Sequence, residues 1–310
     1  MADVSAPAIT VLTPAYNRAD TLQRLRDSLA LQTCRDFEWV IIDDGSGDYI
    51  KNLVESWIAS GDIDINYRWQ ANQGKPVAVN RGIELARGEF TTIIDDDDRF
   101  VENALERLLH HWRVMRNGER KAFSGVIGLC AFEDGRIVGD RYPSDPFDCD
   151  PVELAYVHKI AGDKHGLLRT DVLREFPYPF EDLRGHVIDA LIWNRMALKY
   201  RERHVNEVIT IKEYRPEGIT ARERGLLIRA APATRQFFLE EAQLPHRLST
   251  RTRLRSYANY ARYSFHAGAG LRAQARDVPS IATWAALSPF GFALYLRDLW
   301  RMAVLRRRIR

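Results

Sequence analysis

The sequence predicts an α/β protein in which a mostly parallel, Rossmann-like sheet is flanked by helices. Over the first 120 residues, short β-branched and aromatic runs alternate with segments whose apolar residues recur at helical spacing. This alternation favours a sheet with helices on both faces. A second observation is that three of the expected strands end in polar or acidic residues, at 13–18, 43–46 and 95–98. Such sheets bind ligands at the carboxyl ends of their strands, so we expect these residues to converge on one edge.

The expected elements of the first 120 residues follow one another closely. Strands are expected at 8–12, 37–42, 63–69 and 90–94. Helices are expected at 22–29, 50–58, 75–87 with Gly88 as its stop, and 105–112. Because Pro14 disfavours helical backbone in the residue before it, we expect residues 13–18 to form a loop.

The regular alternation ends near residue 121. Two strands are expected at 123–131 and 136–139, joined by a turn at Gly135, and a third at 204–214. A helix is expected over 188–200, and the chain from Arg222 onward is helical and rich in arginine. We therefore expect a first domain over 1–220, with halves at 1–120 and 121–220, and a C-terminal helical extension over 221–310.

The composition fits a globular protein with a sizeable core. The chain has 310 residues, 45% of them hydrophobic, and a formal net charge of +3. Its three cysteines lie far apart and form neither a metal-type spacing nor a disulfide framework, which suits a reducing compartment. The first residues lack a basic segment followed by an apolar one, so we expect no secretory signal and a cytoplasmic location.

The most informative stretch is the run of four aspartates at 95–98, directly behind the apolar run 90–94. Like charges this close repel unless a cation or hydrogen-bond donors lie among them. Oxygen-rich clusters suit Mg²⁺ or Mn²⁺, often shared with a phosphate. The alternative is capping of a helix N-terminus, which would account for Asp98 before the apolar segment that begins at Val101 but not for four aspartates in a row.

Five short motifs in this order resemble the family 2 glycosyltransferases, which have the GT-A fold. The resemblance covers about residues 8–215. The matching segments are Pro14-Ala15-Tyr16-Asn17-Arg18, Ile41-Ile42-Asp43-Asp44-Gly45-Ser46, Asn72-Gln73-Gly74-Lys75 with Ala78-Val79-Asn80-Arg81-Gly82, Ala86-Arg87-Gly88-Glu89-Phe90 before the aspartates, and Asp189-Ala190-Leu191-Ile192-Trp193-Asn194-Arg195.

This resemblance implies a nucleotide-diphospho-sugar donor bound by the first half of the domain and an acceptor bound by the second. Pro14 and Tyr16 would flank the base, with Asn17 in the same loop, because an aromatic face is suited to stacking a base. Asp44 would accept a hydrogen bond from the base, and Asp96 would lie near the ribose. Asp43 is expected to form the turn beside Gly45.

The resemblance also implies a metal at the diphosphate. Asp95 and Asp97 match the D-x-D motif of the family, with Asp97 as the direct ligand of Mn²⁺ or Mg²⁺. The metal would offset charge on the departing diphosphate. Lys75 would add positive charge there or contact the nucleotide, or else it is a solvated side chain. Four histidines are candidates for a further ligand, although a lone histidine is more often structural: His158, His165, His186 and His204.

Asp189 is the expected general base, which would remove the acceptor's hydroxyl proton as the oxygen attacks the anomeric carbon. Relatives with the Trp-Asn-Arg pattern often carry Glu at this position. Asp182 is the rival base, and the helix that follows Asp189 favours the latter. Trp193 in that helix is expected to be a core aromatic residue.

The function implied is an inverting, metal-dependent transfer of a sugar, with UDP as the expected nucleotide, to a hydroxyl of a glycan or lipid-linked acceptor in surface polysaccharide or glycolipid synthesis. One alternative is a sugar nucleotidyltransferase, but the glycine-rich phosphate loop of that class is missing after the first strand. The other is a non-catalytic sugar-binding module, which would not need the aspartate run together with Asp189.

The tail at 278–310 combines aromatic and basic residues. The uncharged stretch 278–296 has 19 residues, close to the roughly 20 that a transmembrane helix needs, but Pro289 and Gly291 make it a poor span. An interfacial helix on an anionic membrane surface is expected instead, the alternative being a helix packed on the first domain. A nucleic-acid partner is not expected. The residues concerned are Trp284, Phe290, Phe292, Tyr295, Arg297, Trp300, Arg301, Arg306, Arg307, Arg308 and Arg310.

Overall fold

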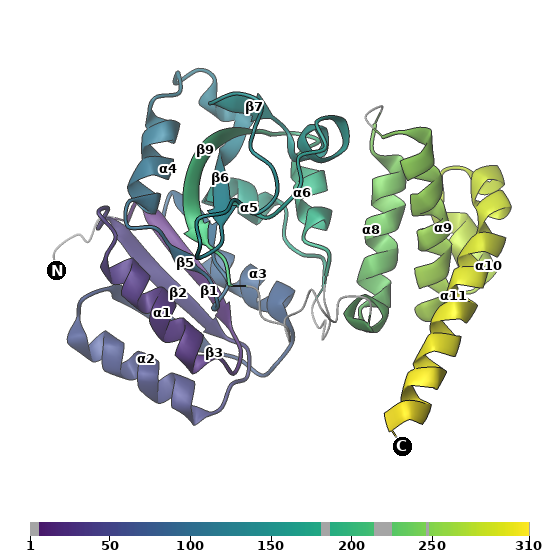
Figure 1. Ribbon diagram of the computed structural model, residues 1–310, viewed down its shortest axis with the longest axis horizontal. Helices are drawn as coiled ribbons and strands as arrows, with labels where there is room; N and C mark the ends of the chain where they lie inside the picture. Colours follow the sequence, from purple (N-terminus) through teal and green to yellow (C-terminus); the bar gives the residue numbers. More distant parts are fainter. Residues whose placement is uncertain (1–5, 181–186, 214–224, 246–247, 310) are drawn as a thin grey trace. The chain divides into compact units, whose positions relative to one another are not determined.

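The computed structural model describes residues 6–180, 187–213, 225–245 and 248–309 (Figure 1). The chain divides into two compact units. The first unit comprises Met1–Arg184 with Arg195–Pro216, and the second comprises Gly185–Asn194 with Glu217–Arg310. All strands of the described chain belong to the first unit, and the long C-terminal helices belong to the second.

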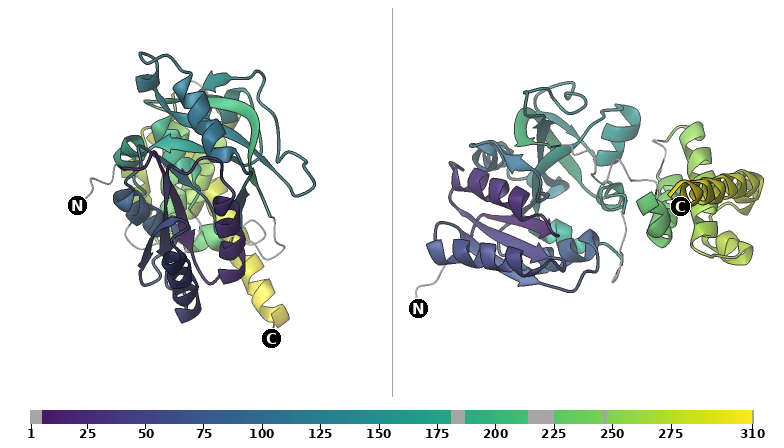
Figure 2. Two further views of the ribbon diagram at one scale, coloured as in Figure 1. Left: turned by 90° about the vertical axis from the view of Figure 1, so that its left-hand side faces the viewer. Right: turned by 60° about the horizontal axis from the view of Figure 1, so that its bottom comes forward.

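The first unit is built on a mixed sheet, visible from two further directions in Figure 2. The strand order is β3-β2-β1-β4-β8-β6-β9-β5, with β7 also paired to β9. β3, β2, β1 and β4 are parallel, as is the β6–β9 pair, whereas β8, β5 and β7 run antiparallel to their neighbours. The strands are β1 (Ile9–Ala15), β2 (Phe37–Asp43), β3 (Asp64–Trp69), β4 (Phe90–Ile93), β5 (Arg99–Phe100), β6 (Phe123–Ala131), β7 (Phe147–Cys149), β8 (Lys164–Arg169) and β9 (Arg201–Ile211).

Helices cover both faces of the parallel strands. Successive side chains of a strand point to opposite faces, so Trp39 and Ile41 of β2 enter the core that α1, α2 and α4 share. Leu12 of β1 faces the other side, where α3 approaches so closely that a Cβ on Gly82 would lie 2.0 Å from a Leu12 methyl. The helices are α1 (Ala19–Ala30), α2 (Asp48–Ser60), α3 (Lys75–Leu85), α4 (Ala104–Arg113), α5 (Thr170–Glu175) and α6 (Ala190–Met196), which crosses from one unit to the other.

Two expectations about strands need correction. β1 continues through Pro14 to Ala15 rather than ending at Leu12, because β4 pairs only as far as Leu12 and a proline is tolerated where a strand has a neighbour on one side. Ile137 forms a single bridge to Ala131, and residues 136–139 form no strand because the backbone turns at Gly139, whose φ is 74°.

Two helices are shorter than expected. α6 ends at Met196 rather than at residue 200, because β9 already begins at Arg201. α3 ends at Leu85, and Gly88 lies beyond it in a close approach to β1, where a Cβ would meet the Thr10 nitrogen at 2.5 Å. Glycine is therefore needed at 88 for packing rather than as a helix stop.

The second unit contains α8 (Ala231–Gln243), α9 (Thr250–His266), α10 (Leu271–Asp277) and α11 (Ile281–Ile309). Tyr257 and Tyr260 of α9 and Trp284 of α11 form its core, so Trp284 is a packing residue and not the exposed interfacial one that the sequence suggested. Asp298 of α11 is buried against Arg262 of α9 at 2.6 Å. Within the described ranges, every helix is too short or too polar to span a bilayer.

Candidate active site

The loops that follow β1, β2 and β4 meet at the carboxyl edge of the parallel strands. Asp96, after β4, accepts a hydrogen bond from the backbone nitrogen of Tyr16, after β1, at 3.3 Å. Ser46, after β2, accepts one from the nitrogen of Asn17 at 2.8 Å. Asn17 adopts a φ of 54°, a left-handed conformation that asparagine tolerates better than most residues. The convergence expected from the alternating sequence pattern is therefore present.

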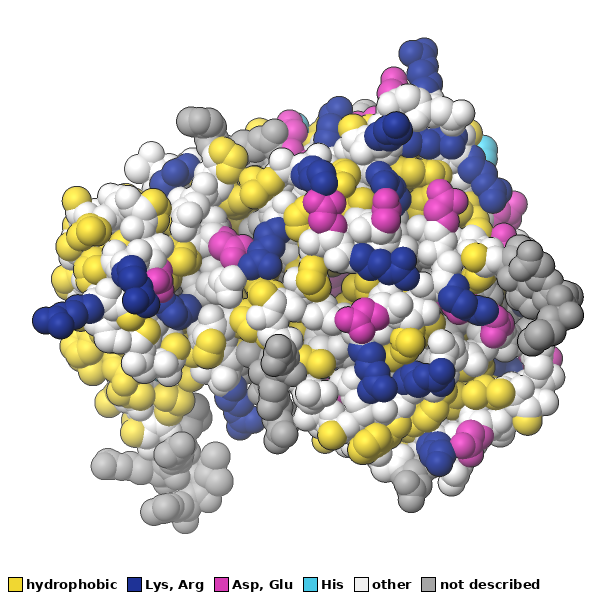
Figure 3. Space-filling view, turned by 180° about the vertical axis from the view of Figure 1, so that it is seen from behind, with side chains coloured by type: hydrophobic (Ala, Val, Ile, Leu, Met, Phe, Trp, Pro, Cys, Tyr) yellow, Lys and Arg dark blue, Asp and Glu magenta, His cyan; other side chains and the backbone are white. Residues whose placement is uncertain are grey.

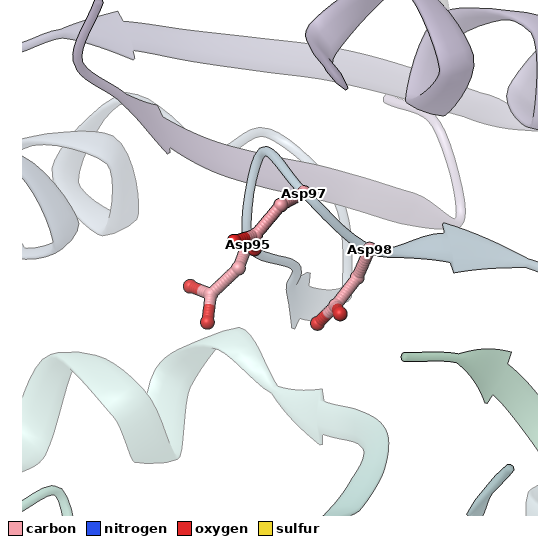
Figure 4. A group of neighbouring side chains, drawn as sticks. All are labelled: Asp95, Asp97 and Asp98. Carbon is pink, nitrogen blue, oxygen red and sulfur yellow. The ribbon is translucent and has the colours of Figure 1, made fainter. Parts of the chain in front are cut away.

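Three of the four consecutive aspartates form one acidic group. Carboxylate oxygens of Asp95, Asp97 and Asp98 all lie within 4.8 Å of one another. Figure 4 shows the three side chains on the tight loop between β4 and β5, with Asp95 and Asp98 pointing the same way. Three carboxylates at this separation are a donor set that suits a hard divalent cation.

Three basic side chains, Lys75, Arg18 and Lys212, offset the charge of this loop. Nζ of Lys75, the first residue of α3, lies 2.6 Å from Oδ1 of Asp95. The guanidinium of Arg18 lies 3.1 Å from Asp96 and also pairs with Asp97. These ion pairs offset the mutual repulsion expected of four consecutive aspartates, because each carboxylate lies beside a cationic group. Arg18 belongs to the first motif, but the sequence alone indicates no role for it.

The ionisation of the aspartates follows from burial and from these partners. Burial by itself would raise the pKa of Asp95, but Lys75 and then Lys212 hold it well below its usual value. Burial raises the pKa of Asp96 to about 7, with Arg18 opposing the shift and the neighbouring aspartates adding to it. Asp95 is thus a carboxylate at neutral pH.

Asp98 does not start the next helix, contrary to the sequence interpretation. α4 begins at Ala104, and the residue at its N-cap position is Asn103. Asp98 is only 5% exposed and pairs with Lys212 at the end of β9, with Nζ 2.6 Å from Oδ2. It therefore belongs to the acidic group together with Asp95 and Asp97.

Asp44 organises the segment that leads into α3. Its Oδ1 accepts hydrogen bonds from the Gln70 amide at 2.8 Å and the Gln73 nitrogen at 2.9 Å, and its Oδ2 accepts one from the Gly74 nitrogen at 2.8 Å. The side chain is buried. Because Lys75 follows Gly74 directly, Asp44 fixes the start of the helix that carries Lys75 toward Asp95.

Asp43 forms the turn beside Gly45, as expected from its position before glycine. Its Oδ1 accepts from the Ser46 nitrogen at 2.7 Å, three residues further on, and its Oδ2 accepts from the Tyr67 hydroxyl at 2.7 Å. Gly45 lies within this turn, between Asp43 and Ser46, and has a φ of 93°. A Cβ at this position would lie 2.8 Å from the Asn72 nitrogen, so the turn requires glycine.

Exposed aromatic side chains surround the same strand ends. Tyr16 is 48% exposed, in agreement with a loop residue available to a ligand. Tyr49 and Trp69, which the sequence interpretation passed over, are also about half exposed; they bond to Asn17 at 3.5 Å and to the Ser46 carbonyl at 3.4 Å. An aromatic residue that ends β3 and another in the first turn of α2 would have been the sequence signal for these two.

The three candidate histidines in the described chain lie outside the acidic group. His165 is held between Thr92, at 3.0 Å from Nε2, and Thr210. Burial, with Lys212 nearby, lowers its pKa to about 3, so its ring is neutral. Nδ1 of His204 donates to the Phe147 carbonyl at 3.0 Å, and His158 lies 3.6 Å from Glu153. His186 lies outside the described residues.

Asp189 belongs to the second unit, whereas the acidic group belongs to the first. Its carbonyl accepts from the Ile192 nitrogen at 3.1 Å, in the first turn of α6. Ile188 beside it packs on a cluster formed by Leu227, Ala231 and Tyr263. Trp193 is half-buried. Asp182, the rival base, lies outside the described residues.

Comparison with known proteins relates the first part of the chain to a described family. Residues 10–127 match the family model of glycosyl transferase family 2. The GalNAc(5)-diNAcBac-PP-undecaprenol beta-1,3-glucosyltransferase of Campylobacter jejuni is 31% identical over 129 residues, 41% of this chain and 39% of that protein. The putative teichuronic acid biosynthesis glycosyltransferase TuaG of Bacillus subtilis is 27% identical over 54% of this chain and 63% of its own length. The chain thus spans less than two thirds of these relatives.

Solved structures show the same fold. TarS 1–349 of S. aureus in complex with UDP-GlcNAc has a TM-score of 0.61 at 19% identity, covering 91% of this chain and 80% of that one. The mannosyltransferase PcManGT of Pyrobaculum calidifontis, in complex with GDP-Man and Mn²⁺, has a TM-score of 0.56 at 20% identity, covering 96% and 83%. Residues 10–127 of this chain therefore match glycosyl transferase family 2, on a GT-A fold that the solved structures share.

Proposed function

We propose that this chain is an inverting, metal-dependent glycosyltransferase that moves a sugar from a nucleotide-diphospho-sugar to an acceptor hydroxyl. The observation that carries the proposal is the acidic group of Asp95, Asp97 and Asp98 at the carboxyl edge of the parallel strands. The family match over residues 10–127 supports transfer of a sugar, and the acidic group supports a diphosphate held through a cation.

The donor nucleotide would lie along the loops after β1 and β2. Tyr16 would stack on the base, with Pro14 and Asn17 beside it, since exposed aromatic faces bind bases of any sequence. Asp44 would complete the base contact, and Asp96 would lie near the ribose. UDP is the nucleotide we favour; the TarS structure holds UDP-GlcNAc, while PcManGT holds GDP-Man.

The donor set fits a divalent metal. Asp95 and Asp97 would hold Mn²⁺ or Mg²⁺, with Asp98 as a further oxygen ligand, because all three carboxylates approach one another within 4.8 Å. Such a metal supplies positive charge that stabilises the departing diphosphate. Lys75 and Arg18 already lie beside these carboxylates, so their cationic groups would contact the diphosphate oxygens when the donor binds.

Asp189 would act on the acceptor. Its carboxylate would take the proton of the attacking hydroxyl, and the sugar would then be delivered with inversion at the anomeric carbon. Asp182 is the second candidate for this role. In both cases one carboxylate removes one proton while the nucleoside diphosphate leaves.

The acceptor class we favour is a glycan or lipid-linked sugar in surface polysaccharide or glycolipid synthesis. The Campylobacter relative is named for a PP-undecaprenol acceptor and TuaG for teichuronic acid biosynthesis, which supports this class. A lipid-linked acceptor would bring a cytoplasmic enzyme to a membrane surface, and residues 278–310 are the part of the chain we infer to make that contact.

Nucleotide binding tests the donor and metal parts of the proposal. Thermal unfolding is measured with UDP, GDP, CDP and ADP, each with and without Mn²⁺. Because a ligand at 100 times its Kd stabilises the folded state by about 2.7 kcal/mol, we expect one nucleotide to raise Tm clearly, and more so with Mn²⁺. The Asp97→Asn variant should lose the Mn²⁺-dependent part of the rise in Tm, while its Tm without ligand should match that of the wild type. Equal Tm values with and without Mn²⁺ for every nucleotide would contradict metal dependence.

Transfer itself tests the base. Asp189→Asn should keep nucleotide binding but abolish release of nucleoside diphosphate in the presence of acceptor, whereas Asp182→Asn should retain it. If Asp182→Asn alone abolishes transfer, the base is Asp182. Release of inorganic pyrophosphate from a nucleoside triphosphate and a sugar phosphate would identify a nucleotidyltransferase instead.

A further inference from the structure

α11 has one side that is covered and one that is not. Trp284, Gly291 and Asp298, spaced seven residues apart, lie on the covered side and are buried. A Cβ on Gly291 would lie 2.5 Å from the Ala258 carbonyl of α9, so the two helices are in close contact there. The other side, which we call the α11 apolar face, is 39–67% exposed at its large residues. These are Ile281, Phe290, Phe292, Leu296, Leu299 and Trp300.

The residues between these are apolar as well. Ala282, Ala285, Ala286, Pro289 and Ala293 are all exposed, and residues 281–296 contain no charged side chain. Figure 3 shows hydrophobic side chains gathered on the second unit, at the left of that view. Soluble proteins rarely expose contiguous apolar surface of this extent unless another surface covers it.

The charge of the C-terminal residues indicates what kind of surface covers the α11 apolar face. Residues 217–310 contain 17 arginines, no lysine and six acidic residues, a formal net charge of +11, whereas residues 1–216 carry −8. Arg297 and Arg301 are exposed at the margin of the α11 apolar face. A second copy of this chain would bring two such basic surfaces together, which like charges oppose. An anionic lipid surface matches both the apolar residues and the arginines.

We propose that the α11 apolar face lies in the interfacial layer of a membrane that contains anionic lipid. Phe290 and Trp300 would insert among the acyl chains near the headgroups, and Arg297 and Arg301 would extend to the lipid phosphates. Arg262 holds α11 through Asp298 on the opposite side, so the helix would bind as part of its unit. The inference rests on the proposed function because a lipid-linked acceptor would be presented at the same surface.

Vesicle flotation of the full chain tests this surface without any donor or acceptor. We expect the protein to float with phosphatidylcholine vesicles that contain phosphatidylglycerol, and at least about tenfold less with the double variant Phe290→Ser, Trp300→Ser. The matched control is Leu254→Ser, Leu271→Ser, which changes two exposed leucines on α9 and α10 and should float like the wild type. Arg297→Gln and Arg301→Gln should each lower the binding constant roughly fivefold.

The outcomes separate this inference from the proposed function. The Asp189→Asn variant should float like the wild type, so a loss of transfer in that variant would leave the membrane proposal intact. The proposal is wrong if the wild type stays unbound to anionic vesicles, or if the Phe290, Trp300 variant binds them equally well. A dimer of the wild type in sedimentation velocity that becomes a monomer in the Phe290, Trp300 variant would also contradict the proposal, provided that vesicles bind neither protein. The face would then be a protein interface. Circular dichroism confirms that each variant is folded.

Discussion

Nζ of Lys212 lies 2.6 Å from Oδ2 of Asp98, which joins the end of β9 to the aspartate loop after β4. The two residues are 114 positions apart, and the lysine and aspartate side chains are 19% and 5% exposed. The pair neutralises the most deeply buried carboxylate of the acidic group, and it also keeps the pKa of Lys212 above its usual value, although burial alone would lower it. The acidic group is therefore held in place from outside its own loop.

Removing Lys212 should destabilise the first unit strongly. Lys212→Met leaves Asp98 buried without its partner, and breaking a buried pair costs about 3–5 kcal/mol. Lys199→Met is the matched control, because Lys199 pairs with Glu175 on the surface and such pairs contribute about 0–1 kcal/mol. Urea unfolding measures both. Adding Asp98→Asn to Lys212→Met should recover part of the loss, and a double variant as unstable as the single one would contradict the pairing.

Glu207 should make stability depend on pH in the acid range. Two hydrogen bonds from Arg107, at 2.5 and 2.8 Å, outweigh burial and, with His111, lower the pKa of Glu207 to about 2. This stabilisation is complete above the unfolded pKa near 4.5 and is lost as the pH falls toward 2. Glu207→Gln should cost about 1–2 kcal/mol at pH 7, a moderate figure because the site is partly exposed.

Urea unfolding of this variant across pH 2–7 checks the expectation. The free-energy difference from the wild type should narrow below pH 4.5. Glu84→Gln, on the exposed side of α3, should show no such narrowing. A constant difference down to pH 2 would mean that Glu207 does not carry the linkage.

The three cysteines should differ in reactivity. Burial raises the pKa of Cys130 and of Cys149 to about 12, so at pH 8 only roughly one in ten thousand of either is a thiolate, whereas Cys34 is half-buried. A thiol reagent should label one cysteine quickly in the native chain and three in denaturant. Cys34→Ser should remove the fast phase, and a fast phase that persists would place a reactive thiol elsewhere.

Asp44 should affect both stability and donor binding. Asp44→Ala leaves the nitrogens of Gln73 and Gly74 and the Gln70 amide without their acceptor, which should cost at least about 2 kcal/mol. The start of α3 would loosen, and Lys75 with it, so the Kd for the nucleotide should rise. Asp44→Asn keeps one acceptor oxygen and should fall between the alanine variant and the wild type. Calorimetric titration with the nucleotide and urea unfolding measure the two effects; an unchanged Kd would restrict Asp44 to a structural role.

The sequence by itself determined the class of the fold and the place of the candidate site. β-branched runs such as Ile41-Ile42 and the helical spacing of Leu22, Leu25 and Leu29 are local patterns, and local periodicity decides whether a segment forms a strand or a helix. The rule that parallel strands present their carboxyl ends to a ligand then placed Asp44 and Asp95 on one edge.

Only the tertiary structure decided how the individual side chains are used. Nothing local to Asp98 shows that Lys212 will pair with it, and nothing local to Trp284 shows that it is buried while Phe290 and Trp300, on the same helix, are exposed. The first pair is set by the antiparallel pairing of β5 with β9, which puts Arg99 opposite Ile211, and the burial of Trp284 is set by the close packing of α9 on α11. Pairing and burial depend on which distant segments meet in space, and periodicity along the chain carries no information about that.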